Sequence, residues 1–335
     1  MRIARYKQEL QVAVYHVFSR VVDRLFKFDD DTKDSFRELI RKVAFFSGVQ
    51  VITYAIMSNH FHILVRVQPI WTVVGEEEVR ERVGRLYGEA KKTWLKNKVA
   101  RLREAGDPEA AEALLDSYRA RMNDISEFMK TLKLRMTIGF NRGHKRGGTL
   151  WEGRFGSVLL EDTPNSELLR LVAAYIDLNP VRANIVRNPS EYGWNGASDA
   201  MLNDPMFGKP AKEGIASLYR NSPDRELEEY ARLLREHAFK TIQAVRTGDS
   251  AHGARSEARA GAGKEASAGK SSGALPLTVL HVKNNTFMRG RAIGRRGFIM
   301  KVAGACPVGG VTPCHGGRDG SFLVSGSLAR RNANA

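Results

Sequence analysis

The feature that most constrains the fold is a pair of apolar segments, "VQVITYAIM" and "HFHILVRV", separated only by Ser58-Asn59. Both are rich in β-branched and aromatic residues, as strands are, and so short a turn returns the second strand beside the first. Upstream, "VAVYHVFSRV" (Val12–Val21) predicts another strand. The stretch between them, "DTKDSFRELIRKVAFFSG", has apolar residues at helical spacing and ends at Gly48. The predicted order is therefore β-α-β-β.

A second helix and a fourth strand follow farther along the chain. "ISEFMKTLKLRMTIGFNRGHKRGG" predicts a helix with one apolar face, and "TLWEGRFGSVLLE" predicts a strand. "PNSELLRLVAAYIDLN" predicts another helix, with Thr163 as its N-cap and Pro164 at its first position. The order β-α-β-β-α-β plus a helix predicts an α+β fold, a ferredoxin-like antiparallel sheet with helices on one face.

Composition divides the chain into five parts. We expect a core from residues 1–74 and 124–200, interrupted at 75–123 by a charged, inserted helical hairpin. Residues 201–245 predict accessory helices. Residues 246–273, rich in Gly, Ala and Ser, predict a flexible linker, and residues 274–335 predict a basic, partly disordered C-terminal segment.

The charge favours a polyanionic partner, nucleic acid above all. The formal net charge is +16, but the chain from Arg246 onward contributes 14 basic and only 4 acidic residues. The N-terminal stretch lacks the apolar region of a secretory signal, and no apolar run approaches the roughly 18 residues of a membrane helix. With only Cys306 and Cys314, we expect a cytoplasmic protein without a disulfide framework. A zinc site at these cysteines and His315 is a weak alternative because no CxxC pair is present.

Two histidines, His60 and His62, flank Phe61 in the strand "HFHILVRV". Alternate residues of a strand share a face, at about 6.5–7 Å between Cα atoms, so both imidazoles can reach one metal ion. Phe61 and the apolar residues that alternate with the histidines are then expected to face a core. The alternative is that the histidines are simply two polar residues on a wet face.

A tyrosine and an asparagine, Tyr175 and Asn179, are four residues apart on a predicted helix and share a face. Taken singly, a tyrosine in this setting is more often a packed aromatic residue, and an asparagine before proline is more often a helix-end residue. Together they fit tyrosine attack on a phosphodiester. A phenol with a pKa near 10 is about one part in a thousand ionised at neutral pH, so it needs a metal, a base or a positive field. Two histidines and one amide oxygen suit Mg²⁺ or Mn²⁺.

Three ordered blocks, "YAIMSNHFHILVRV", "SEFMKTLKLRMTIGFNRGHKRGGTLWEGRFGSVLLE" and "LLRLVAAYIDLNPVRANIV", resemble the single-tyrosine HUH transposases, and most of all their REP-associated branch. The resemblance covers Val12 to about Met201, apart from the insertion. It implies that His60, His62 and Asn179 bind the metal and that Tyr175 is the nucleophile. It also implies a single-stranded DNA endonuclease and strand transferase that cleaves next to hairpin DNA through a 5′-phosphotyrosine.

Basic residues are candidates for DNA binding. They follow the second helix at Arg142, Lys145 and Arg146, and the resemblance adds Arg154 and Arg182. A solvated turn and salt bridges within the fold are the alternatives. The expected partner is single-stranded or hairpin DNA, bound by a monomer or homodimer away from any membrane. The other function considered is a catalytically silent nucleic-acid-binding protein, although the aromatic pattern of RNA-recognition sheets is absent.

Overall fold

The computed structural model describes residues 7–25, 27–163, 166–202, 204–219 and 225–246, and three short strands at 292–295, 312–314 and 321–325. At its centre is an antiparallel sheet in the order β2-β3-β1-β4. Its strands are β1 (Ala13–Arg20), β2 (Val49–Ile56), β3 (His60–Val67) and β4 (Gly156–Leu160). The α+β class and the four-stranded ferredoxin-like order are thus confirmed.

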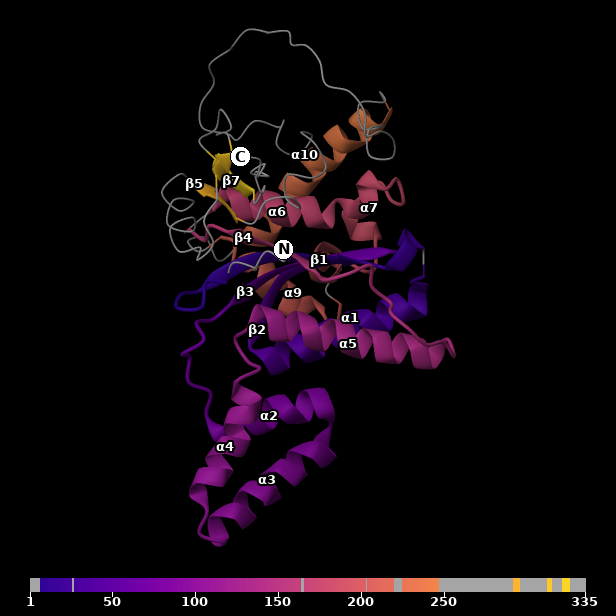
Figure 1. Cartoon of the computed structure of the whole chain (residues 1–335). Helices are drawn as coiled ribbons and strands as arrows, with labels where there is room; N and C mark the ends of the chain where they lie inside the picture. Colours follow the sequence, from indigo (N-terminus) through magenta and orange to yellow (C-terminus); the bar gives the residue numbers. More distant parts are fainter. Residues whose placement is uncertain are drawn as a thin grey trace, which may run out of the picture.

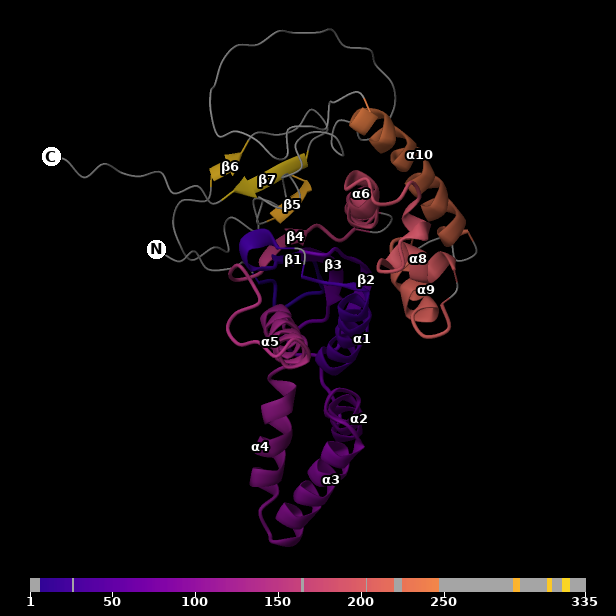
Figure 2. The ribbon, with the colours of Figure 1, turned by 90° about the vertical axis from the view of Figure 1, so that its right-hand side faces the viewer.

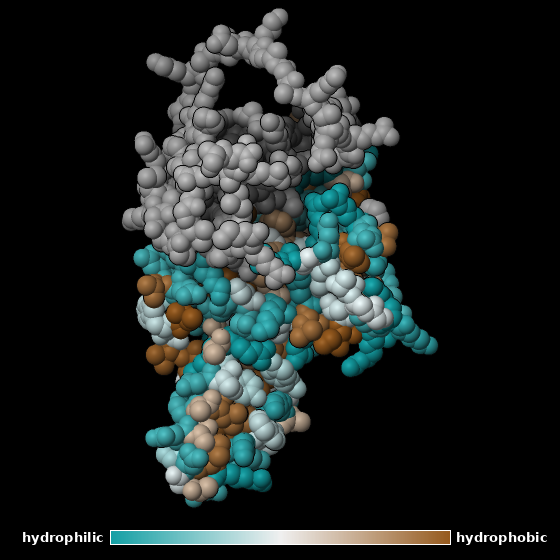
Figure 3. Space-filling model, in the orientation of Figure 1, coloured by the Kyte–Doolittle hydropathy of each residue, from teal (hydrophilic) through white to brown (hydrophobic). Residues whose placement is uncertain are grey.

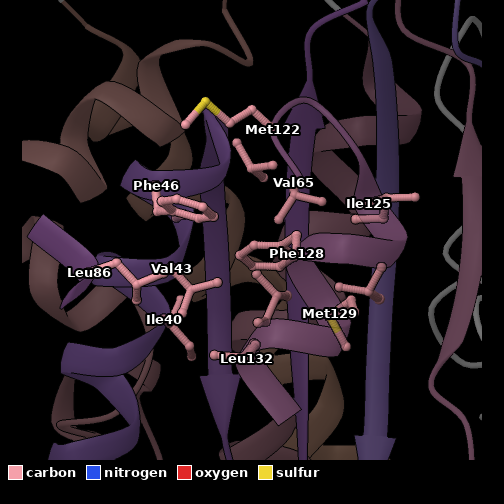
Figure 4. Packing of buried hydrophobic residues seen from close by; sticks show 14 of the residues in the cluster. Ile40, Val43, Phe46, Val65, Leu86, Met122, Ile125, Phe128, Met129 and Leu132 are labelled. Atoms are coloured by element: carbon pink, nitrogen blue, oxygen red, sulfur yellow. The ribbon is translucent and has the colours of Figure 1, made fainter. Parts of the chain in front are cut away.

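Two helices, α1 (Asp30–Ser47) and α5 (Ile125–Gly143), cover one face of the sheet, below it in Figure 1. Asp29 caps α1 by accepting a hydrogen bond from the Thr32 backbone N–H at 2.9 Å. Gly48 ends α1 with a φ of 64°, a left-handed conformation that favours glycine. Apolar side chains of both helices interdigitate with Val65 of the sheet to form the larger core (Figure 4).

The opposite face of the sheet is covered as well, which corrects the expectation of helices on one face only. The helices of this second layer are α6 (Glu167–Asp177), α7 (Asn179–Arg182), α8 (Gly196–Met201), α9 (Gly208–Ala216) and α10 (Glu226–Arg246). Of these, α6, α7 and α10 lie above the sheet in Figure 1, and α8 and α9 lie beside β2 in Figure 2. Val14 of β1 and Leu64 of β3 are fully buried beneath them. Because the strands carry apolar residues on both sides, a single helical layer would leave one apolar face in water.

The helix α6 begins three residues later than expected. Its N-cap is Ser166, whose hydroxyl accepts from the Leu169 N–H at 3.3 Å, whereas the carbonyl of Thr163 only accepts from the Ser166 N–H. The predicted first position, Pro164, lies outside the described residues. Pro180 does not end the helical region, because it occupies the first turn of α7, where a missing N–H costs no hydrogen bond.

The insertion is made of three helices, α2 (Glu76–Tyr87), α3 (Glu89–Glu104) and α4 (Pro108–Arg119). One arm of the expected hairpin is divided at Gly88, where φ is 91°. The three helices extend away from the sheet, beyond α1 and α5 (Figures 1 and 2). At the base of the insertion, the Asn123 N–H donates to the Ser47 carbonyl at 2.7 Å. The insertion is therefore attached to the end of α1.

Three short strands extend the sheet beyond β4. The strand β5 (Ala292–Arg295) pairs in parallel with β4, and β7 (Ser321–Ser325) and β6 (Thr312–Cys314) follow in antiparallel pairs. They lie within the segment 274–335, whose other residues are outside the described part. Of the predicted linker 246–273, Arg246 ends α10 and the rest is outside the described part. None of the described helices is long and apolar enough to cross a membrane.

Candidate active site

The two histidines of β3 lie on the face predicted for them. Phe61 and every second residue after it belong to the core between the sheet and the helices α1 and α5. Leu64 belongs to the core between the sheet and α6. The side chains of His60 and His62 therefore point toward α6. His62 is only 2% exposed and His60 is half-buried, so this is not the wet face of the alternative interpretation.

A third histidine, His16 on β1, joins the pair and was not recognised in the sequence. It is fully buried, and its Nε2 lies 2.9 Å from Nδ1 of His62. Nδ1 of His60 is likewise engaged, at 2.6 Å from Oδ1 of Asn59. The Asn59 oxygen can only accept, so Nδ1 of His60 donates and its Nε2 keeps its lone pair for a further partner. The same holds for His62 in the tautomer in which its Nδ1 donates to His16. Metal-binding histidines are commonly oriented in this way.

Both β3 histidines are electrically neutral at pH 7. Burial lowers the pKa of His60 to about 4, with further lowering from Arg20 and Arg182. Burial also lowers the pKa of His62 well below its usual value, with His16 adding to the shift. Neutral imidazole is the form that binds a metal.

Tyr175 reaches this cluster from α6. Its ring is edge-on to His62 and His16, with ring centroids 6.0 and 6.1 Å apart, and the residue is only 6% exposed. The guanidinium carbon of Arg182 lies 4.0 Å from the Tyr175 ring centroid, and the same guanidinium donates a hydrogen bond to the Tyr175 carbonyl. Burial lowers the pKa of Arg182 to about 10, so it remains a cation at neutral pH.

Asn179 is half-buried one helical turn after Tyr175. Its Nδ2 donates to the carbonyls of Tyr175 and Ile176 at 3.2 and 3.1 Å, which fixes the amide and directs Oδ1 away from the helix backbone. Among the described residues, no three His, Cys, Asp or Glu side chains are arranged to hold a metal. The resemblance implies Asn179 as the third metal ligand with His60 and His62, and this stays a prediction; such a donor set suits Mn²⁺ or Mg²⁺.

A buried carboxylate, Asp177, fixes the tyrosine helix from its inner side. Its oxygens accept from Thr53 Oγ1 at 2.8 Å, from the Ala197 N–H at 3.3 Å and from the Tyr230 hydroxyl. These donors belong to β2, α8 and α10. Burial raises the pKa of Asp177 to about 7. The position of Tyr175 thus depends on helices that follow it in the chain.

The predicted DNA-binding residues do not all gather at the site. Arg182 does, and Arg20, which the sequence interpretation missed, lies opposite His60 in the strand register. Arg142 and Lys145 are exposed where α5 ends, at the same end of the sheet as α7 (Figure 1). Arg146 donates to the Thr149 carbonyl at 3.1 Å, a local structural role. Arg154 is exposed and has no ion pair with any described residue.

Comparison with known proteins gives one family match for this chain. Residues 10–100 match the family model of IS200-like transposases. This match agrees with the resemblance seen in the sequence over these residues. It includes the β1 and β3 histidines and ends before Tyr175 and Asn179.

A solved structure described as a REP-associated tyrosine transposase bound to a REP hairpin is also similar to this chain. The two share 13% sequence identity, with a TM-score of 0.37, over 62% of this chain and 87% of the other. No curated protein matches the chain.

Proposed function

We propose that this protein cleaves single-stranded DNA next to a hairpin, with Tyr175 as the nucleophile, and can rejoin the cleaved strand to another end. The observation that carries the proposal is the edge contact of Tyr175 with His62 and His16. A buried phenol from α6 and histidines from two strands meet at one place, and that place adjoins the cations of Arg182 and Arg20. The resemblance to REP-associated enzymes favours a short palindromic hairpin as the neighbouring element.

The reaction is a transesterification that needs no external energy source. The Tyr175 oxygen forms a bond to phosphorus and gives up its proton to solvent, while the bond from phosphorus to the 3′-oxygen breaks. The leaving oxygen becomes a 3′-hydroxyl, and the 5′-phosphate stays on Tyr175. A 3′-hydroxyl that attacks the phosphotyrosine reverses these bond changes, which gives strand transfer.

His60, His62 and Asn179 are the residues that would hold the divalent ion, Mg²⁺ or Mn²⁺. When bound, such an ion polarises the phosphodiester and offsets the charge that develops on its oxygens. Arg182 holds the tyrosine through its carbonyl and its ring, and its cation favours a phosphate nearby. His16 and Asn59 orient the two imidazoles from behind.

Tyr175 packs against histidines of its own chain, and this supports cleavage in cis. A monomer then suffices for catalysis, although a homodimer is compatible with the same site. We assign the site to the core, residues 1–74 and 124–200, because every group named above belongs to it. The segments 201–245 contribute through Tyr230, which binds Asp177.

The test is a covalent-adduct assay with labelled single-stranded hairpin DNA, in Mg²⁺ or Mn²⁺, separated on denaturing gels. We expect a protein–DNA adduct that disappears in Tyr175→Phe and in EDTA. The matched control is Tyr118→Phe, because Tyr118 is a partly buried tyrosine of α4 far from the site. Tight binding without any adduct would favour the catalytically silent DNA-binding protein, and an adduct that persists in Tyr175→Phe would refute the assignment of the nucleophile.

A further inference from the structure

The basic and acidic residues of the insertion are concentrated on different helices. Residues 75–123 carry 11 basic and 10 acidic residues, so the insertion is nearly neutral as a whole. Six of the basic residues but only two of the acidic ones lie on α3. The acidic side chains are concentrated on α2 and α4 instead. A strongly basic helix is therefore displayed at the far end of the insertion (Figures 1 and 2).

The two flanks of α3 differ in whether their cations form ion pairs. On the flank toward α2, Lys92 pairs with Glu81 and Arg103 pairs with Glu76 at 2.6 Å. The other flank carries a stripe of residues three, four and three positions apart, which places them on one side of the helix. The members of this α3 stripe are Lys91, Trp94, Lys98 and Arg101. Lys98 and Arg101 are exposed and have no ion pair with any described residue.

Trp94 lies within the α3 stripe and remains 45% exposed, although Leu95 and Val99 beside it are buried against the other helices. The ammonium of Lys91 lies 3.4 Å from the Trp94 ring centroid. A large aromatic ring among unpaired cations is poorly suited to a solvated face. It is well suited to nucleic acid, since a ring can stack on a base while cations contact phosphates. In Figure 3 the projecting insertion shows hydrophobic residues among hydrophilic ones.

We propose that the α3 stripe binds single-stranded DNA, with an unpaired base stacked on Trp94 and phosphates on Lys98 and Arg101. A single strand is favoured over a duplex because only an unpaired base offers its face to the ring. From Lys91 to Arg101 the stripe advances ten residue steps, about 15 Å along the helix axis. This binding is separate from the cleavage proposed above, so it can be refuted while the adduct assay succeeds.

The experiment measures binding of a fluorescent oligo(dT) strand to the full chain by anisotropy at several salt concentrations. We expect Trp94→Ala to weaken binding roughly tenfold and Trp94→Phe to restore most of it, because base stacking contributes at this level. Lys98→Glu should also weaken binding and reduce the dependence of affinity on salt, since a phosphate contact is lost.

The matched control is Lys96→Glu, which makes the same charge change on α3 but on the flank where Lys96 lies near Glu77. It should bind within about twofold of the wild type, because any loss of general charge attraction is small beside a direct phosphate contact. Three outcomes would overturn the proposal. These are wild-type binding by Trp94→Ala, equal losses in Lys96→Glu and Lys98→Glu, and equal affinity for the single strand and for a duplex of the same length.

Discussion

His16 and His62 stand on neighbouring strands with 2.9 Å between Nε2 of the first and Nδ1 of the second, and both are buried. His16 therefore orients the imidazole of His62, which is proposed to bind the metal. We expect His16→Ala to weaken Mn²⁺ binding by about 10- to 100-fold, as the loss of such orienting partners does. Titration of Mn²⁺ by calorimetry measures this. His144→Ala is the control, because His144 stacks on Phe140 beneath the opposite face; equal losses in both variants would contradict the role.

Arg182 both covers the ring of Tyr175 and binds its carbonyl. Arg182→Lys keeps the charge but loses the planar contact and the directed hydrogen bond. We expect it to slow adduct formation about tenfold and leave Mn²⁺ affinity unchanged, because the metal ligands are not touched. The rate is read from gels under single-turnover conditions. Arg154→Lys, an exposed site with no such contacts, should keep the wild-type rate; a comparable loss there would point to a general charge effect.

The buried carboxyl group of Asp199 predicts that the free energy of unfolding decreases as the pH rises. It accepts a hydrogen bond from Arg37 at 2.9 Å, yet its burial outweighs this pair and raises its pKa to about 6. The folded chain then holds a proton that the unfolded chain releases near pH 4, so this contribution to stability falls as pH rises from about 4 to 6. Relative to Asp199→Asn, the free energy of unfolding of the wild type should decrease over that window. Urea unfolding at several pH values measures it. A difference between wild type and Asp199→Asn that does not change with pH would refute the prediction.

Two helix glycines should respond oppositely to alanine. Gly139 on α5 has open space around it, so Gly139→Ala should stabilise the fold by about 0.5–1 kcal/mol through helix propensity. Gly214 on α9 lies against the backbone of β2, where a Cβ would clash with the Ile52 carbonyl and lie 2.6 Å from the Val51 carbonyl. Gly214→Ala should therefore destabilise by about 1–3 kcal/mol. Thermal unfolding distinguishes the two, and stabilisation by both variants would mean that α9 does not pack closely on the sheet.

Periodicity was sufficient to predict the sheet and the direction of its side chains. The alternation in "HFHILVRV" correctly placed His60 and His62 on one face and Phe61 on the other, because a strand has only two faces. The core helices α1 and α5 were predicted as well, since each has a single apolar stripe. The helix α6 and the accessory helices at 201–245 were also predicted, but not that they cover the second face of the sheet, because short helices such as α8 and α9 carry too little pattern to show what they cover.

Only those residues of the candidate site that belong to a short local motif were predicted from the sequence. His16 is embedded in the apolar strand "VAVYHVFSRV", where a lone histidine looks like a core residue, and its meeting with His62 depends on strand pairing that no local pattern specifies. Arg20 was missed for the same reason. Arg20 is recognised only once the pairing of the two strands is known, because the register places it opposite His60.

The three hydrogen bonds to Asp177 also have a consequence for how the protein is made. The histidine strands leave the ribosome early, whereas Tyr230 follows Asp177 by more than fifty residues. A nascent chain can therefore complete its sheet while the helix that carries Tyr175 still lacks the donors of α8 and α10. In such a chain the histidines would be in position before the helix that carries Tyr175 is fixed against the sheet. If Tyr175 is the nucleophile as proposed, we expect cleavage of DNA to begin only after the C-terminal helices have docked.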